Sequence, residues 1–360
     1  MQVIRDDGSL DPRLDPGLPV ERVVSLYKAM VRTRVVDDRL QKIQRQGRIA
    51  FHVGSLGEEA AIIGAAAALR DQDWIVPCYR EVGALLWRGY PLQRYLDHMY
   101  GNAGDPARGR QMPSHSFSRE HRYLAVSAPI GTQIPHAVGL AMAAKKRGLD
   151  ECAAVFFGDG ATSSNDFHAA MSFAGVYQAP VLFLCRNNGY AISLPASEQC
   201  AARSLADKAP GYGIPATRVD GNDVLAVWSV VREAVERASD GGGPAFIEMM
   251  TYRLGGHSTS DDPRVYRSDA EVESQRRADP LSKLRMHIEQ SGAWSPSLDE
   301  QWHLDCEAEA REAVEAAESQ APSELSELFT DVYAERPWHL REQEEQALRD
   351  RGRKRGAPNE

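Results

Sequence analysis

Apolar and polar residues follow one another in a regular order along this chain, most clearly between residues 153 and 190. An apolar run, AAVFF, is followed by a Gly-Asp-Gly turn, a segment with helical spacing and a second apolar run, VLFLC. Two short apolar runs separated by a helical segment predict parallel strands joined by a crossover helix. The predicted fold class is therefore α/β, with a parallel sheet flanked by helices.

Further elements are expected on both sides of this unit. Val20 to Gln46 has apolar residues at helical intervals and is predicted to form one long helix. Ser55 and Glu58 have the spacing of a capping box, so Ser55 is predicted to begin a second, alanine-rich helix that runs to Leu69. The remaining predictions are a strand at 74–76, a small-residue helix at 136–146, a strand ending near 219, a helix at 224–238 and a strand at 245–252.

The order of these elements indicates one large domain with an extension at each end. The first residues are rich in Pro, Gly and Asp, which is typical of a mobile or surface-wrapping arm. Beyond residue 280 the chain is charged and helical in its spacing. The expected divisions are an N-terminal arm (1–19), an α/β domain (20–280), a C-terminal helical extension (281–348) and a flexible tail (349–360).

Composition narrows the classes of partner and compartment. With 360 residues the chain can bury a large core, and a net charge of −9 disfavours a nucleic-acid partner. The five cysteines are scattered without a CxxC pair, which argues against a disulfide framework and a zinc site. No targeting leader is visible among the acidic first residues, and the longest apolar run is too short to span a bilayer. We therefore expect a cytoplasmic protein with no membrane partner.

The two turns of the central unit carry the residues that suggest chemistry. Asp159 follows the first strand and Asn188 the second, so both lie at the carboxyl edge of the sheet, where α/β folds bind ligands. A carboxylate, an amide oxygen and the backbone carbonyl of Tyr190 form the all-oxygen set that Mg²⁺ prefers. Gly158 and Gly160 let the backbone approach phosphates closely. The pattern predicts a divalent metal that holds a diphosphate.

Other candidate residues lie in turns outside this unit. Arg80 follows a short strand and can bind a phosphate with its guanidinium fork, while the apolar Ile130 in a polar turn suits support of a flat ligand. His257, flanked by glycines at the end of a predicted strand, is the strongest histidine candidate. Glu58 and Glu59 could form a catalytic carboxylate pair, but we interpret them as first-turn residues favoured by the helix dipole.

Six motifs in a fixed order together resemble a known family. They are YREVG, GRQMPSH, GDGATSSND, CRNNGYAIS, RVDGNDV and YRLGGHSTSDDP. From about Tyr27 to Leu340 the chain resembles the alpha subunit of the thiamin diphosphate-dependent first component of 2-oxo acid dehydrogenase complexes. Within that family the HSTSDD sequence looks like the branched-chain class. The resemblance implies the diphosphate-binding half of the thiamin diphosphate-binding fold, with a helical C-terminal extension.

The resemblance also implies roles for individual residues. Asp159, Asn188 and Tyr190 match the Mg²⁺ ligands. His257 and Ile130 match catalytic positions: the histidine orients or stabilises intermediates, and the isoleucine holds the cofactor in its bent form. The matched cofactor contacts are Tyr79, Arg80, Ser127, Ile130, Gly158, Asp159, Gly160, Ala161, Arg186, Asn188, Tyr190 and His257.

Two further groups of residues are carried over in the same way. Phe51 and Tyr79 match the substrate pocket, and Ser258 with the loop after it is expected to form a mobile lid. Two positions depart from the branched-chain pattern: Asp159, where Glu is frequent, and Cys78, where Gln is frequent. The residues that match a monovalent-cation loop, which binds K⁺ in some members, are Ser127, Pro129, Thr132 and Gln133.

The implied activity is oxidative decarboxylation of branched-chain 2-oxo acids such as 3-methyl-2-oxobutanoate. The cofactor carbanion attacks the 2-oxo carbon, CO₂ leaves, and the acyl group passes to the lipoyl arm of the acyltransferase component. Thiamin enzymes need a carboxylate at the aminopyrimidine, and the family places it on a separate beta subunit. We therefore expect an alpha₂beta₂ heterotetramer and no activity from this chain alone.

Three alternatives remain open at this point. The nearest is a pyruvate or acetoin dehydrogenase alpha subunit, with the same chemistry on a smaller substrate. A nicotinamide-dependent oxidoreductase is disfavoured, because no G-x-G-x-x-G motif opens a helix after a strand. A non-catalytic scaffold subunit is disfavoured by the presence of Asp159, Asn188 and His257.

Overall fold

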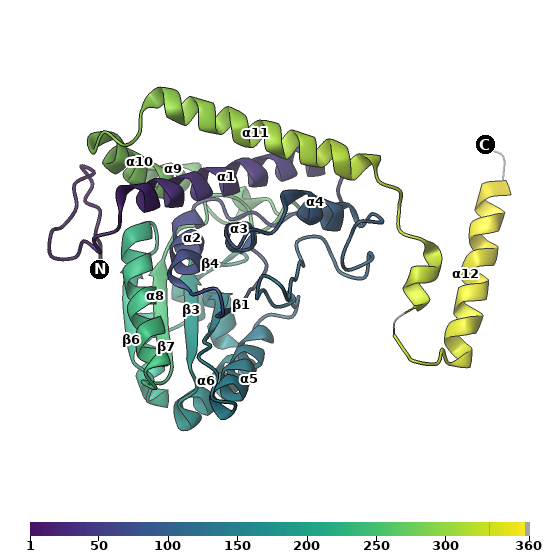
Figure 1. Cartoon of the computed structure of the whole chain (residues 1–360), viewed down its shortest axis with the longest axis horizontal. Helices are drawn as coiled ribbons and strands as arrows, with labels where there is room; N and C mark the ends of the chain where they lie inside the picture. The colour runs from purple at the N-terminus through teal and green to yellow at the C-terminus, as the bar shows by residue number, and fades with distance from the viewer. Residues whose placement is uncertain (331, 357–360) are drawn as a thin grey trace.

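A five-stranded parallel sheet forms the centre of the computed structural model in Figure 1, which describes residues 1–330 and 332–356, with side chains as far as residue 351. In spatial order the strands are β1 (Trp74–Val76), β2 (Ala153–Gly158), β3 (Val181–Asn187), β7 (Ala245–Met250) and β6 (Ala216–Asp220). Gly158 of β2 pairs with Arg186 of β3, so the turns after these two strands open at the same edge. The parallel sheet and the shared edge confirm the sequence prediction.

Helices cover both faces of the sheet, as parallel strands require. On one face lie α2 (Glu59–Ala68) and α8 (Val224–Ser239), with α1 (Val20–Arg45) behind them; on the other lie α5 (Gln133–Lys146) and α6 (Asn165–Tyr177). Successive side chains of a strand point to opposite faces of the sheet, so alternate residues pack against the helices on each face. In β2, Ala154 and Phe156 pack in the core with α2 and α8, while Val155 and Phe157 pack in the core with α5 and α6.

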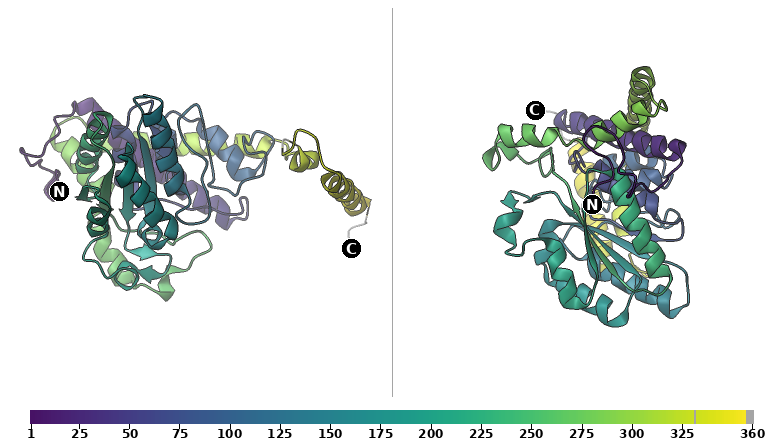
Figure 2. Two further views of the ribbon diagram at one scale, coloured as in Figure 1. Left: turned by 90° about the horizontal axis from the view of Figure 1, so that it is seen from below. Right: turned by 90° about the vertical axis from the view of Figure 1, so that its left-hand side faces the viewer.

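The C-terminal part lies along the domain and then leaves it. Helix α11 (Pro296–Ser319) runs beside α1, where the Tyr27 hydroxyl donates to Asp299 Oδ1 at 2.6 Å. The chain then extends away to α12 (Trp338–Gly356), as Figures 1 and 2 show. A small hairpin is formed by β4 (Tyr190–Ala191) and β5 (Leu194–Pro195). The other described helices are α3 (Val82–Trp87), α4 (Leu92–Tyr100), η1 (Asp159–Ser163), α7 (Ala196–Gln199), η2 (Leu205–Tyr212), η3 (Pro263–Val265), α9 (Asp269–Arg276), α10 (Pro280–Gln290) and η4 (Leu325–Phe329).

Most element boundaries lie within three residues of the sequence prediction, and two helix starts differ more. Helix α2 begins at Glu59, not at Ser55, because the Ser55 hydroxyl donates to Asp37 Oδ2 at 2.7 Å instead of capping the helix. The Gly-Asp-Gly turn continues as the short η1 helix, so α6 begins only at Asn165, capped by Ser164.

The described part of the C-terminal extension consists of helices joined by non-helical stretches. Helix α12 reaches Gly356, past the expected start of the tail at residue 349, and residues 357–360 lie outside the described part of the chain. Among the described residues no helix has both the length and the apolar character needed for a membrane span.

The first residues of the chain are anchored to the domain through one buried carboxylate. Asp223 caps α8 by accepting from Leu225 N and Ala226 N with Oδ1, each at 3.0 Å. Its Oδ2 accepts from the backbone N–H groups of Val3 and Ile4, each at 2.6 Å, and both of those side chains are buried. One aspartate therefore satisfies four backbone donors and joins the N-terminal segment to the start of α8.

We expect Asp223→Ala to lower the free energy of unfolding by about 2–4 kcal/mol, since it removes a helix cap and leaves buried N–H groups without an acceptor. Guanidinium unfolding measures this loss, and trypsin should cleave the variant faster at Arg5 and Arg13. Asp223→Asn, which keeps the shape and part of the acceptor capacity, is the control and should lose less. Equal stability of the alanine variant and the parent chain would contradict this account.

Candidate functional site

A cavity of about 320 Å³ opens at the carboxyl edge of the sheet, where β2 and β3 end. This volume falls in the range of roughly 300–1,000 Å³ that is usual for ligand sites. All the predicted cofactor contacts except Ser127 line it. The lining residues are Cys78, Tyr79, Arg80, Ile130, Gly158, Asp159, Gly160, Ala161, Arg186, Asn188, Tyr190, Ala191, Ile192, Arg253 and His257.

The predicted metal ligands lie together on one side of this cavity. Asp159 is 1% exposed, and its Oδ2 is buried without a hydrogen-bond partner among the described residues. Burial raises the pKa of its carboxyl from 3.8 to about 6. Asn188 Nδ2 donates to Glu58 Oε1 at 3.0 Å, and its Oδ1 accepts from Tyr190 N at 3.3 Å, which leaves the second lone pair of Oδ1 for a cation. A buried carboxylate oxygen without a donor, next to an amide oxygen, fits a divalent metal.

Beneath the metal ligands, Arg186 is ion-paired with two buried carboxylates. Its Nη1 contacts Glu58 Oε2 and its Nη2 contacts Glu81 Oε1, and all three side chains are at most 2% exposed. Glu81 Oε2 also accepts from the backbone N–H groups of Cys78 and Arg80, at 2.9 and 3.1 Å. Both Nη atoms of Arg186 are therefore occupied by carboxylates, and its Nε is buried without a partner in the described chain.

This ion-paired group corrects our interpretation of Glu58 and Glu59. Glu59 is a first-turn residue of α2 as expected, but it is buried against Arg34 with Nε and Oε1 2.8 Å apart. Glu58 is the residue before the first turn, and it joins Arg186 to Asn188. Sequence spacing could not show this, because Arg186 is 128 positions away from Glu58. Glu58 fixes the orientation of the Asn188 amide, a role that the sequence analysis did not assign to it.

Arginine side chains border the cavity from two other loops. Arg80 donates to the backbone oxygens of Gly54 and His257, the second at 2.7 Å. Arg253, which the sequence analysis did not single out, donates to Tyr190 O at 3.2 Å and to Ile192 O at 2.6 Å. Its position immediately after β7, at the same edge of the sheet, is the signal that could have identified it. These two cations favour an anionic ligand such as a diphosphate.

His257 is a neutral imidazole at physiological pH. Burial lowers its pKa from 6.5 to about 4, and the positive charges of Arg80 and Arg253 contribute. Its Nδ1 lies 3.3 Å from Arg80 Nη2, and its ring meets the Tyr79 ring edge to face with centroids 6.1 Å apart. An imidazole in this environment can accept or donate a hydrogen bond without carrying charge.

Apolar side chains form the outer rim of the cavity. Ile130 is 47% exposed, and Ile192 is 56% exposed with a φ of +60°, a conformation that a β-branched residue adopts only under constraint. Ile192 lies in the two-residue turn between β4 and β5, where hairpins favour positive φ, and Arg253 also binds its carbonyl. Cys78 also lines the cavity, and burial raises the pKa of its thiol to about 12, so the thiol is neutral.

Two groups of predicted residues lie outside the cavity lining. Ser127 lines a neighbouring open groove, with its Oγ 2.7 Å from Thr132 Oγ1. Phe51 is half-buried and precedes His52, whose backbone pairs with Thr259 in the loop after β7. Its assignment to the substrate pocket stays a prediction, as do the individual roles of the other site residues.

The chain is similar to curated proteins over most of its length. It is 45% identical over 341 residues to the mitochondrial 2-oxoisovalerate dehydrogenase subunit alpha of Bos taurus, which covers 94% of this chain and 75% of that protein. The corresponding Homo sapiens protein is 44% identical, covering 94% and 77%. The mitochondrial 2-oxoisovalerate dehydrogenase subunit alpha 2 of Arabidopsis thaliana is 47% identical over 325 residues, covering 90% and 69%.

These relatives contradict the expected cytoplasmic location. All three are named as mitochondrial proteins. The expectation depended on the acidic first residues and on the cysteine pattern. Unpaired cysteines indicate a reducing environment rather than a particular compartment, so they could not distinguish the cytoplasm from other reducing compartments.

A family model described as "Dehydrogenase E1 component" matches residues 27–326. The matched region contains the whole sheet, every residue that lines the cavity and the buried group of Glu58, Glu81 and Arg186. The resemblance noted in the sequence motifs is confirmed, and this chain belongs to the dehydrogenase E1 component family.

Proposed function

We propose that this chain is the alpha subunit of a branched-chain 2-oxo acid dehydrogenase, and that its cavity binds thiamin diphosphate through Mg²⁺. The observation that carries the proposal is the buried Asp159 carboxylate, whose Oδ2 has no partner among the described residues and lies at the same sheet edge as Asn188. Membership of the E1 family and relatives named 2-oxoisovalerate dehydrogenase subunit alpha support it.

In this proposal the metal is held by the three oxygen donors at the ends of β2 and β3. Asp159 supplies the carboxylate and Asn188 the amide oxygen. The Tyr190 carbonyl already accepts from Arg253 Nη1 at 3.2 Å, which leaves its second lone pair for the cation. A divalent ion removes the cost of burying the Asp159 charge, the same cost that raises its pKa in the metal-free chain.

The cations and the histidine orient the diphosphate and the substrate end of the site. Arg80 and Arg253 bring positive charge to the cavity, while both Nη atoms of Arg186 are ion-paired with Glu58 and Glu81. Thiamin diphosphate, when bound, supplies the carbanion that attacks the 2-oxo carbon and the electron sink for loss of CO₂. His257, held near Arg80, hydrogen-bonds to the reacting carboxylate or carbonyl as a neutral group. Ile130 supports the ring of the cofactor from the rim of the cavity.

A second subunit is needed to complete this site. Asp159 is the one carboxylate that lines the cavity within the described residues, and the metal uses it, so none is left for the aminopyrimidine. The rim is apolar and exposed at Ile130 and Ile192, as expected for a surface that another chain covers. The C-terminal arm, which leaves the domain in Figures 1 and 2, exposes Tyr333 (60%) and Trp338 (69%). We assign both surfaces to the beta subunit of an alpha₂beta₂ assembly that serves a lipoyl acyltransferase.

A monovalent cation such as K⁺ is proposed for the loop before α5. Thr132 Oγ1 lies 2.7 Å from Ser127 Oγ and 2.9 Å from Pro129 O, so three oxygens meet in this loop. Gln133 Nε2 donates to Phe156 O at 3.0 Å, while its Oε1 is buried without a partner in the described chain. The cation would brace the loop that carries Ile130.

Comparison of the isolated chain with the pair tests the partner and the substrate class together. Without the beta subunit we expect decarboxylation of 3-methyl-2-oxobutanoate to be at least about 100-fold slower, because a missing general acid–base costs this much or more. With the beta subunit, kcat/KM should favour this substrate over pyruvate by roughly 15-fold, from two buried methyl groups at about 0.8 kcal/mol each. Full activity of the alpha chain alone would contradict the partner, and a preference for pyruvate would contradict the substrate class.

Titration of His257 followed by NMR tests the charge state of the site. In the metal-free chain we expect its imidazole resonance to titrate with a midpoint near pH 4 instead of 6.5, because burial disfavours the charged form. A folded pKa below the unfolded value also means that this group lowers stability as the pH falls from about 6.5 towards 4. His257→Gln identifies the resonance by its disappearance. A midpoint near 6.5 would contradict the neutral role.

A further inference from the structure

The loop that carries His257 is attached to a segment far away in the sequence. We call residues 254–259 the His257 loop and residues 52–56 the support segment. His52 N donates to Thr259 Oγ1, and Thr259 N donates to His52 O, both at 3.1 Å. These two bonds fix the far end of the His257 loop to the backbone of the support segment.

The near end and the middle of the His257 loop are attached to the same segment. Leu254 N donates to Leu56 O at 3.1 Å, which fixes the beginning of the loop. In the middle, Arg80 donates to the backbone oxygens of both Gly54 and His257. The position of His257 at the cofactor cavity therefore depends on the position of the support segment.

Two buried side chains hold the support segment to helix α1. Asp37 of α1 accepts with Oδ2 from the backbone N and the hydroxyl of Ser55, both at 2.7 Å. Its Oδ1 lies 3.1 Å from Nε2 of His52, a side chain only 1% exposed. A carboxylate oxygen accepts hydrogen bonds, so His52 Nε2 is the donor to Asp37 Oδ1. Asp37 thus binds the segment at two residues.

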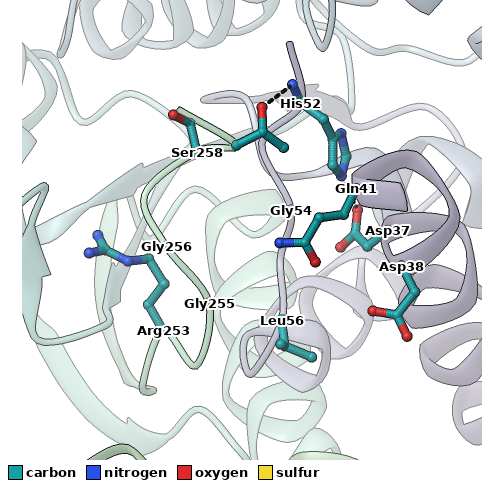
Figure 3. A pocket seen from close by; sticks show the side chains of 11 residues that line it. Asp37, Asp38, Gln41, His52, Gly54, Leu56, Arg253, Gly255, Gly256 and Ser258 are labelled. Atoms are coloured by element: carbon teal, nitrogen blue, oxygen red, sulfur yellow. Dashed lines mark hydrogen bonds and ion pairs between the residues drawn. The ribbon is translucent and has the colours of Figure 1, made fainter. Parts of the chain in front are cut away.

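The His257 loop is also held by the residues that follow it: Arg267 Nη2 donates to Leu254 O at 3.1 Å and to Gly255 O, and His257 N donates to Asp261 Oδ2 at 2.6 Å. Figure 3 shows the support segment between α1, which presents Asp37 and Gln41, and the glycines of the loop. A small cavity of about 50 Å³ lies here, lined by Asp37, His52 and the loop residues Gly255 and Gly256 among others. His257 lines the cofactor cavity instead. The loop is therefore a thin wall between two cavities, held by hydrogen bonds more than by packed side chains.

We propose that Asp37 and His52 are a positioning pair for the reaction: they fix the support segment, and through it they hold His257 and its loop at the cofactor cavity. His52 does not line the cofactor cavity. Its effect on the reaction therefore passes through its backbone hydrogen bonds with Thr259. The predicted loss of cofactor affinity rests on the proposed function, whereas the predicted loosening of the His257 loop does not.

The decisive variant is His52→Phe, which keeps the ring volume and removes the donor to Asp37. In the chain without cofactor, amide hydrogen exchange at Leu254 and Thr259 should become about tenfold faster, the size expected for one lost buried hydrogen bond. In the assembled holoenzyme, the Kd for thiamin diphosphate with Mg²⁺ should rise and kcat should fall, each about tenfold, with the KM for substrate within about twofold.

Two matched variants separate positioning from general destabilisation. His52→Gln places an amide N–H near the position of Nε2 and should restore slow exchange, Kd and kcat. Gln41→Leu alters the same small cavity, and the Gln41 side chain makes no hydrogen bond with the described residues, so this variant should behave like the parent chain. Exchange in β2 and β3 should be unchanged in all three variants.

The outcomes distinguish this inference from the proposed function. Unchanged exchange in the His257 loop of His52→Phe, or no rescue by His52→Gln, would overturn the positioning pair. Faster exchange with an unchanged Kd and kcat would overturn its link to the reaction. If His52→Phe does not fold, Ser55→Ala, which removes the hydroxyl donor to Asp37 Oδ2 and so weakens the other link between the support segment and α1, tests the same attachment. Failure of the parent holoenzyme to bind the cofactor would refute the proposed function and leave the exchange result standing.

Discussion

The buried ion pairs of Arg186 with Glu58 and Glu81 are the interaction on which the cavity depends. They join three segments that are distant in sequence: the residues before α2, the turn after β1 and the end of β3. Burying three charged groups is costly, and removing one partner of such a group typically costs about 3–5 kcal/mol, so the three segments hold one another in place. Glu58 then orients Asn188, and Glu81 shapes the turn that presents Arg80.

The charges of the cavity are complementary to a metal diphosphate. On one side burial raises the pKa of the Asp159 carboxyl to about 6, and its Oδ2 has no hydrogen-bond partner among the described residues, which favours a cation beside it. On the other side burial lowers the pKa of His257 to about 4, the charges of Arg80 and Arg253 contribute, and these two cations favour an anion. A ligand with a divalent metal at one end and phosphates beside it would place a cation beside the Asp159 carboxylate and an anion beside the two arginines. The same groups would be poorly matched to a neutral ligand.

How much of this could be predicted depended on whether the signal was local. The βαβ unit and the placement of Asp159 and Asn188 at one edge follow from strand periodicity and the geometry of parallel strands, so the sequence was sufficient. Ser55 and Glu58 were misjudged because each satisfies a local capping rule, while their real partners, Asp37 and Arg186, are set by tertiary packing. The only local signal for Arg253 is its position after β7 at the carboxyl edge of the sheet. Its role appears only when the loop after β7 folds against Tyr190.

The central claim is that the ends of β2 and β3 bind magnesium and, through it, thiamin diphosphate. Calorimetric titration of the assembled enzyme with thiamin diphosphate and Mg²⁺ tests it most directly, with the parent chain compared to Asp159→Ala and Asn188→Ala. Loss of a ligand to a buried charge costs on the order of 3 kcal/mol, so each variant should bind about 100-fold more weakly. Retention of the parent affinity by both variants would contradict the account.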